Sequence, residues 1–280
     1  MIGGKRKMKR IVAALTAALL IALLLCGCAE NGNGNNNGNE NGNGSAKKRV
    51  AFTFDDGPHA PAEDLDEGYY PYTTYVLDKL EALGMKATFF VVGERAAISY
   101  NRAAIARGLA LGCEYGSHTY AHTSLNSLGD EASISQSLTD TENAIMAAGA
   151  PKPTLFRPVG GAANEAQLTY LSGRGYHSIY WSVDTRDWDG HPKTSQKGTE
   201  EYEAFVNGRV DLIMAQVKDG DIILMHDIYM SSVDIFLRAA DRLIAEGYEL
   251  VTVSELLSLD GKTAEPCLYT SKDVKITHAG

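Results

Sequence analysis

Short apolar runs alternate with amphipathic patterns along residues 47–259. The runs predict strands at 50–54, 87–92, 114–117, 155–156, 178–183, 222–225 and 250–253. Between them, helical spacing predicts helices at 73–83, 95–111, 133–148, 165–172, 200–217 and 233–246. Strands that are apolar throughout and separated by helices are typical of a parallel sheet buried under helices. The pattern predicts a single-domain α/β fold and favours a barrel over an open sheet.

The first 46 residues have a different pattern. Residues 5–10 hold five basic side chains, and residues 11–25 are apolar except for one threonine. This apolar run is shorter than the roughly 20 residues that span a bilayer. A basic segment followed by such a run predicts a secretory signal rather than a retained membrane anchor.

The segment after the apolar run points to a lipid anchor. Leu25-Cys26-Gly27-Cys28 resembles the bacterial lipobox, in which the signal is removed before a cysteine that receives lipid. The resemblance implies a signal peptide at 1–27 and lipidation of Cys28. Residues 28–46 are mostly Asn and Gly, which predicts a flexible tether. We therefore expect an exported protein, anchored by lipid in the cell membrane and facing the cell wall.

Composition narrows the classes of protein. The chain has 280 residues, of which 44% are hydrophobic and 22% charged. These values argue against a disordered chain, a coiled coil or a multi-span membrane protein. The net charge of −9 becomes −14 without the first 27 residues, which hold five basic and no acidic residues, and this argues against nucleic-acid binding. No protein partner is evident and we expect a monomer. Whether Cys113 and Cys267 form a disulfide stays open at this stage.

Polar side chains follow five of the predicted strands. Each group alone is typical of a turn, a surface pair or a core residue. Together they predict one pocket, because chemistry collects at the carboxyl ends of parallel strands and buried charges need partners. The groups are DDGP at 55–58, HTYAH at 118–122, RPVGG at 157–161, DTRDW at 184–188 and HD at 226–227.

Two histidines and one carboxylate can bind a divalent transition metal and leave positions open for water and substrate. His118, His122 and one of Asp55 or Asp56 meet this need. Successive residues of a strand point in opposite directions, so one aspartate can bind metal while the other acts as a base. A metal lowers the pKa of bound water from about 15.7 toward 7. His226 is the candidate that protonates the leaving atom.

These motifs occur in an order that identifies a resemblance. TFDDGP, HTYAH, RPVGG, DTRDW and LMH at 224–226 look like the five motifs of the polysaccharide deacetylase family, carbohydrate esterase family 4, with its NodB-type homology domain. ATFFVVG at 87–93 looks like the second strand of the family. The resemblance covers about 47–260 and leaves 261–280 as a tail without an interpretation. It implies a distorted (β/α) barrel of about seven parallel strands and a metal-dependent hydrolase that removes acetyl groups from carbohydrate.

By position, the resemblance implies a metal centre and a catalytic base. Asp56, His118 and His122 would hold the metal. Zinc is the first candidate, and cobalt and nickel are the alternatives. Asp55 would be the base, and Arg157 would orient it.

The resemblance also implies an acid and an acetyl pocket. His226 would be the general acid, held charged and aligned by Asp187. The backbone N–H of Gly160 would bind the oxygen of the tetrahedral intermediate. Leu224 and Trp188 would line the pocket that receives the acetyl methyl group.

The sequence departs from the family pattern at two places. Val159 replaces the second proline of the usual Arg-Pro-Pro motif, which frees a backbone N–H without removing a reacting group. Residues 59–71 lengthen the loop after the first motif. Tyr69 and Tyr70 could provide a surface for stacking sugars, although we favour an acidic, solvated loop.

The lipid anchor favours a fixed polymer of the cell wall as substrate. We expect N-acetylated sugar units of peptidoglycan. Chitin oligomers or O-acetylated xylan are the alternatives for the same enzyme class. A lipid-anchored sugar-binding protein with a decayed active site is a lower-ranked alternative, because Asp55 and His226 are both present.

Overall fold

The structure, a computed structural model, describes residues 47–59 and 71–279. Cys28, the signal peptide and the tether lie outside the described residues, as do Tyr69 and Tyr70. In the described part of the chain, none of the helices has the length and apolarity needed to cross a membrane.

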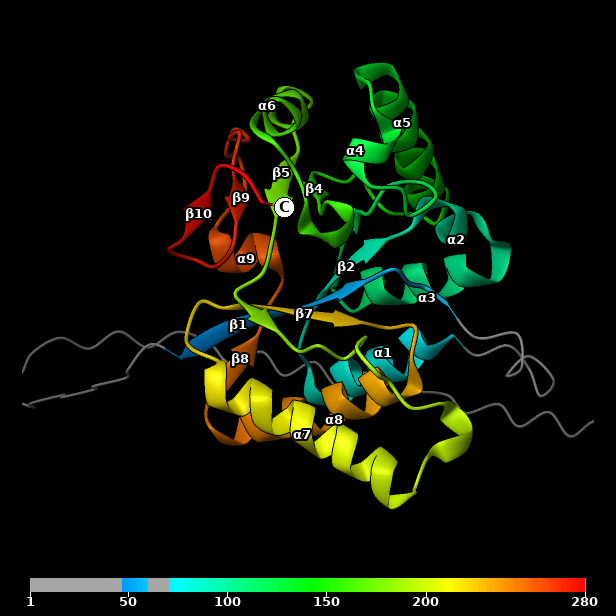
Figure 1. The fold of residues 1–280 in the computed structure, drawn as a ribbon, viewed down its shortest axis with the longest axis vertical. Coiled ribbons are helices and arrows are strands. Elements are labelled where there is room, and N and C mark those ends of the chain that lie inside the picture. The colour runs from blue at the N-terminus through cyan, green and yellow to red at the C-terminus, as the bar shows by residue number, and fades with distance from the viewer. Residues whose placement is uncertain (1–46, 60–70, 280) are drawn as a thin grey trace, which may run out of the picture. The chain divides into compact units, whose positions relative to one another are not determined.

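A curled sheet forms the centre of the described domain (Figure 1). Its order is β10-β9-β5-β4-β3-β2-β1-β7-β6, with β8 paired to β1, and every described pair is parallel except β9–β10. The strands are β1 (Lys48–Asp55), β2 (Thr88–Val91), β3 (Glu114–Ser117), β4 (Leu155–Phe156), β5 (His177–Ile179), β6 (Val183–Asp184), β7 (Ile222–His226), β8 (Tyr248–Leu250), β9 (Leu268–Tyr269) and β10 (Lys275–Ile276). The predicted α/β fold with a parallel, barrel-like sheet is confirmed.

Helices connect the strands, and α1, α7 and α8 pack together beside β1 and β7 (Figure 1). The helices are α1 (Tyr72–Leu83), α2 (Gly93–Ala97), α3 (Ser99–Ala110), α4 (Leu125–Leu128), α5 (Glu131–Ala147), α6 (Glu165–Gly173), α7 (Glu200–Gln216), α8 (Met230–Ala245) and α9 (Val253–Leu257). Two short 3-10 turns, η2 (Val159–Gly161) and η3 (Thr194–Gln196), lie in the loops after β4 and β6.

The segment predicted as one strand at 178–183 is two strands in different parts of the sheet. The backbone N–H of Tyr180 donates to the Tyr269 oxygen on β9, whereas that of Ser182 donates to the Ile222 oxygen on β7. Three residues therefore connect β5, near one edge of the sheet, to β6 at the other edge. This short connection requires the sheet to curl toward closure, which makes it barrel-like.

Alternation along β1 separates a core from the interior of the curl. Phe52 and Phe54 are buried in the cluster that packs against α1 and α8. Ala51, Thr53 and Asp55 point to the opposite face, since side chains alternate along a strand. Ala51 joins the second apolar cluster, and the two polar residues that follow it contact a buried arginine. The strand thus delivers a carboxylate to the end of the sheet interior.

The predicted helix at 95–111 is broken in the structure. Ile98 has an extended conformation, with φ −68° and ψ 127°, and separates α2 from α3. The Asn101 side chain donates to the Arg95 oxygen at 2.9 Å and to the Pro58 oxygen at 3.0 Å. The Arg95 oxygen also accepts from the Ile98 N–H, and the Asn101 bonds attach α3 to α2 and to the loop after β1.

The C-terminal segment is part of the sheet. Beyond residue 260, where the predicted domain ends, β9 pairs with β5 and β10 pairs with β9. The predicted strand at 250–253 is also shifted: β8 ends at Leu250, because the Thr252 side chain accepts from the Glu255 N–H and caps α9.

Cys113 and Cys267 are buried free thiols. The disulfide between them, which the sequence neither predicted nor excluded, is therefore absent.

Candidate active site

Asp55 and Arg157 form a buried ion pair at the carboxyl end of β1. Arg157 Nη1 donates to Asp55 Oδ1 at 2.8 Å and to Thr53 Oγ1 at 2.7 Å. Its Nη2 donates to the Tyr180 oxygen at 2.8 Å, and its side chain is fully buried above the Phe90 ring. Burial lowers the pKa of Arg157, and the charge of Asp55 opposes that shift. The guanidinium fixes one oxygen of Asp55 and leaves Oδ2 for the cavity.

Asp56, His118 and His122 converge on one point beside this pair. Asp56 Oδ1 lies 3.0 Å from His122 Nε2 and 3.5 Å from His118 Nε2. One potential ligand atom from each residue lies within 4.8 Å of the others. Asp56 Oδ1 is buried and has no hydrogen-bond partner among the described residues. A divalent cation would satisfy this oxygen, and the Asp-His-His set with open positions suits a catalytic transition metal.

The two histidines differ in their surroundings. His118 is buried, and its Nδ1 lies 2.8 Å from the Arg157 carbonyl oxygen. Nδ1–H therefore donates to this carbonyl, and the lone pair of Nε2 faces Asp56. Burial lowers the pKa of His118, which favours the neutral imidazole that binds metals. The side chain of His122 is 45% exposed, and the nearby Asp56 carboxylate raises its pKa.

The backbone holds Asp56 and His122 in conformations that are uncommon outside glycine. Asp56 has φ 77° and His122 has φ 53°. Such residues cluster at functional sites, where the surrounding structure fixes them. Burial raises the pKa of Asp56, but the contact with His122 and the charges of the other nearby histidines outweigh it, so the pKa lies below its usual range. The site thus favours an ionised Asp56.

His226, the last residue of β7, and Asp187, three residues after β6, form a second ion pair. His226 Nδ1 lies 2.9 Å from Asp187 Oδ1, and the His226 backbone N–H donates to Oδ2 at 2.8 Å. Asp187 is fully buried. Burial lowers the pKa of His226, but the charge of Asp187 outweighs it and raises the pKa to about 9. The raised pKa favours the protonated imidazole, whose Nε2–H can act as a proton donor.

A cavity of about 490 Å³ joins these groups. Leu224 is buried in its wall, Trp188 is 44% exposed at its border, and Gly160 contributes backbone from η2. The structure thus places every sequence-predicted site residue of the described chain in the cavity or, for Arg157 and Asp187, directly behind it. The roles that the resemblance implies for these residues stay predictions.

Sequence reasoning missed two aromatic residues of the cavity wall, Trp181 and Tyr229. Trp181 lies in the connection between β5 and β6 and stacks on Tyr180, with ring centroids 4.0 Å apart. Tyr229 precedes α8, three residues after His226, and its position so close to the last motif was a usable signal. Asp184 and Val159 also line the cavity.

Comparisons with known proteins agree with this geometry. The family profile described as polysaccharide deacetylase matches residues 42–179. The peptidoglycan-N-acetylmuramic acid deacetylase PdaC of Bacillus subtilis is 35% identical over 75% of the chain, which spans only 39% of that protein. A peptidoglycan-N-acetylglucosamine deacetylase of Bacillus cereus is 32% identical, over 75% of this chain and 89% of its own length.

A solved structure with the same fold carries a metal. The family 4 acetyl xylan esterase of Clostridium thermocellum, solved with a cobalt ion, has a TM-score of 0.65 and 27% identity. The superposition covers 81% of this chain and all of that one. With the motifs, the Asp-His-His cluster and these relatives in agreement, the chain belongs to the polysaccharide deacetylase family.

Proposed function

We propose that this protein is a metal-dependent hydrolase that removes acetyl groups from N-acetylated sugars of peptidoglycan. The reaction adds water to the acetyl carbon and breaks the C–N bond, which gives acetate and a free amine on the sugar. One observation carries the proposal: an Asp-His-His cluster, an arginine-paired aspartate and an aspartate-paired histidine meet in one cavity.

Asp56, His118 and His122 would hold the metal, with zinc as the first candidate. When bound, a divalent ion polarises the acetyl oxygen and acidifies a water molecule. The buried Asp56 oxygen without a hydrogen-bond partner and the oriented His118 ring supply two ligands that need little rearrangement. His122, being half exposed, closes the site toward solvent.

Asp55 takes the proton of the attacking water. Its Oδ2 lies 3.8 Å from His118 Nε2, which places it beside the metal ligands. Arg157 holds the other oxygen, so Asp55 cannot rotate away or swing toward solvent. A carboxylate fixed within reach of the water is the geometry that general-base catalysis needs.

His226 gives its proton to the sugar nitrogen as the C–N bond breaks. Asp187 keeps the ring charged through the hydrogen bond to Nδ1, so the proton to be transferred is the one on Nε2. Leu224 and Trp188 contact the acetyl methyl, and the Gly160 N–H faces the oxygen that becomes negative. Such a preorganised donor contributes about 3–4 kcal/mol to a transition state.

Peptidoglycan is the proposed substrate because two of the relatives described above are named as peptidoglycan deacetylases. The lipobox-like sequence at Cys28 also supports attachment to the membrane beneath the wall. We propose an exported protein with a signal peptide at 1–27, a tether at 28–46 and the catalytic domain after it. Chitin oligomers and acetylated xylan remain the alternative substrates, the latter favoured by the likeness to the xylan esterase.

Acetate release by the fragment 45–280 tests the proposal. The fragment is assayed with zinc and with a chelator, on peptidoglycan, chitin oligomers and acetylated xylan in parallel. We expect zinc-dependent release that is fastest on peptidoglycan. Release from chitin or xylan alone would replace the substrate. A protein that binds one zinc per chain and releases acetate from none would favour the sugar-binding alternative.

A further inference from the structure

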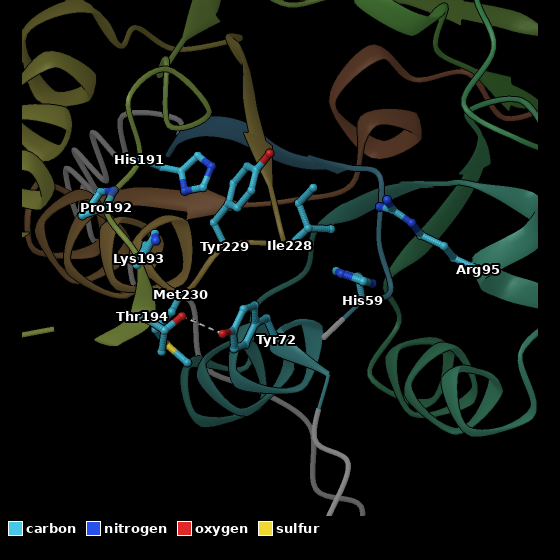
Figure 2. A pocket seen from close by; sticks show the side chains of 10 residues that line it. All are labelled: His59, Tyr72, Arg95, His191, Pro192, Lys193, Thr194, Ile228, Tyr229 and Met230. Atoms are coloured by element: carbon cyan, nitrogen blue, oxygen red, sulfur yellow. Dashed lines mark hydrogen bonds between the residues drawn. The ribbon is translucent and has the colours of Figure 1, made fainter. Parts of the chain in front are cut away.

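A second cavity adjoins the catalytic cavity, and the ring of Tyr229 lines both. Its volume is about 250 Å³ (Figure 2). It lies between residues 191–194, the start of α8 and the residues that follow β1 and β2. Such a volume suits one substituent of a polymer rather than a separate ligand of drug size.

The side chains that line this cavity are basic, although the chain as a whole is acidic. Four side chains carry basic nitrogen, namely His59, Arg95, His191 and Lys193, and within residues 47–59 and 71–279 no Asp or Glu lines the cavity. The chain as a whole has 35 acidic against 26 basic residues. Among the described residues, neither Arg95 nor Lys193 forms an ion pair with a carboxylate. A concave surface with one sign of charge concentrates ligands of the opposite sign.

The basic groups come from two walls that other contacts hold in place. Figure 2 shows His191 and Lys193 on one side of the cavity and His59 and Arg95 on the other. His191 stacks on Tyr229, with ring centroids 3.7 Å apart and planes inclined by 23°. The hydroxyls of Tyr72 and Thr194 are 2.8 Å apart and connect the 191–194 segment to α1. The cavity is therefore formed before any ligand binds.

Arg95 connects this cavity to the reaction centre. Its Nη1 donates to the backbone oxygen of Asp56 at 2.8 Å, and the remaining N–H groups of the guanidinium can serve a ligand. An anion bound here would lie one side chain away from a proposed metal ligand. Because Tyr229 lines both cavities, one polymer strand can reach both of them.

We propose that this cavity binds a carboxylate of the glycan strand beside the sugar that loses its acetyl group. Arginine and lysine bind carboxylates through charge-assisted hydrogen bonds, and arginine can do so with two parallel bonds. Peptidoglycan carries such groups as the lactyl acid of muramyl units or as carboxylates of the stem peptide. Chitin oligomers carry none. The inference rests on the proposed function. It adds that the substrate is a glycan that carries carboxylates.

The test uses two forms of one substrate. Glycan strands freed of stem peptides carry lactyl carboxylates, and methyl esterification removes the charge without changing the backbone. We expect kcat/KM to be about tenfold higher for the acid than for the ester, mainly through KM, as expected for one charge-assisted contact. Lys193→Glu and Arg95→Gln should each move this ratio toward one. Lys272→Glu, the same charge reversal at an exposed site between β9 and β10, should retain it.

A binding measurement separates this inference from the proposed function. Calorimetric titration of the Asp55→Asn variant compares the dissociation constants of acid and ester without turnover. Tighter binding of the acid supports the cavity even if no substrate releases acetate. Equal binding and equal kcat/KM of acid and ester would overturn it, while acetate release from both would leave the deacetylase intact. Strands with stem peptides form a third arm: a preference for them over the free lactyl acid assigns the carboxylate to the stem.

Discussion

Asp187 holds His226 with both of its carboxylate oxygens. Oδ1 lies 2.9 Å from the ring Nδ1, and Oδ2 accepts from the backbone N–H at 2.8 Å. Because Asp187 is fully buried, its charge acts on the ring with little screening. This single carboxylate therefore sets both the orientation and the protonation of the proposed acid.

We expect Asp187→Asn to shift the basic limb of the pH–rate profile to lower pH. A general acid must be protonated, so activity falls as pH rises through the pKa of His226. Burial lowers this pKa and the charge of Asp187 raises it to about 9, so removing the charge moves the fall downward. Profiles of kcat/KM from pH 5 to 10 measure the shift. Asp184→Asn removes a cavity carboxylate that bonds to the Arg186 N–H instead, and should shift the limb less.

Arg157 and Asp55 should be strongly coupled in stability. Removing one partner of a buried ion pair leaves an uncompensated charge and costs about 3–5 kcal/mol. We expect Arg157→Met to lower the free energy of unfolding by that amount in metal-free protein, and Asp55→Asn added to it to restore part of the loss. Denaturant unfolding of the wild type, both single variants and the double variant measures the coupling. Additive losses would show that the pair acts independently.

Asp55→Asn and His122→Ala should separate the base from the metal ligands. Asp55→Asn should retain bound zinc and lose about 10²–10⁴-fold in turnover, the usual contribution of a general base. His122→Ala should lose zinc and activity together, because one of three ligands is gone. Zinc per chain after dialysis and acetate release are measured on the same samples. Zinc retained in full by His122→Ala would exclude His122 as a ligand, and unchanged turnover in Asp55→Asn would exclude the base.

The sequence was sufficient to predict the polar residues of the site that stand at strand ends. Once β1 is recognised, alternation alone sends Asp55 into the sheet interior, and parallel order brings His118 and His226 to the same end. The second cavity was not predicted. Its residues come from loops and helix starts outside the five motifs, and Lys193 has no pattern around it that indicates which wall it faces.

The fold could be predicted where the contacts join residues close in sequence. The prediction failed where the contacts join residues far apart in sequence. The run at 178–183 has no break in its sequence pattern, and only the partners of Tyr180 and Ser182, which lie near opposite edges of the sheet, divide it. In the same way, β9 has two residues, and its pairing with β5 depends on strands about 90 residues apart. Short strands of this kind leave almost no periodicity in the sequence.

Gly160 and Gly161 should respond differently to alanine. Both have positive φ, 66° and 74°, so each alanine carries a backbone cost of roughly 1–2 kcal/mol. A Cβ on Gly160 meets nothing within 4 Å, whereas one on Gly161 would lie 2.2 Å from the Tyr180 ring and 2.8 Å from Trp181.

The stacked rings cannot move apart freely, since Tyr180 also supplies the carbonyl that Arg157 binds. We therefore expect Gly161→Ala to lose about 1–3 kcal/mol more stability than Gly160→Ala, the usual cost of overpacking. Gly161→Ala should also change the tryptophan emission, because Trp181 is one of only two tryptophans. Thermal unfolding and fluorescence spectra of both variants measure the difference. Equal losses of stability with unchanged spectra would mean that the ring pair yields, and that the position of Trp181 in the cavity wall does not depend on Gly161.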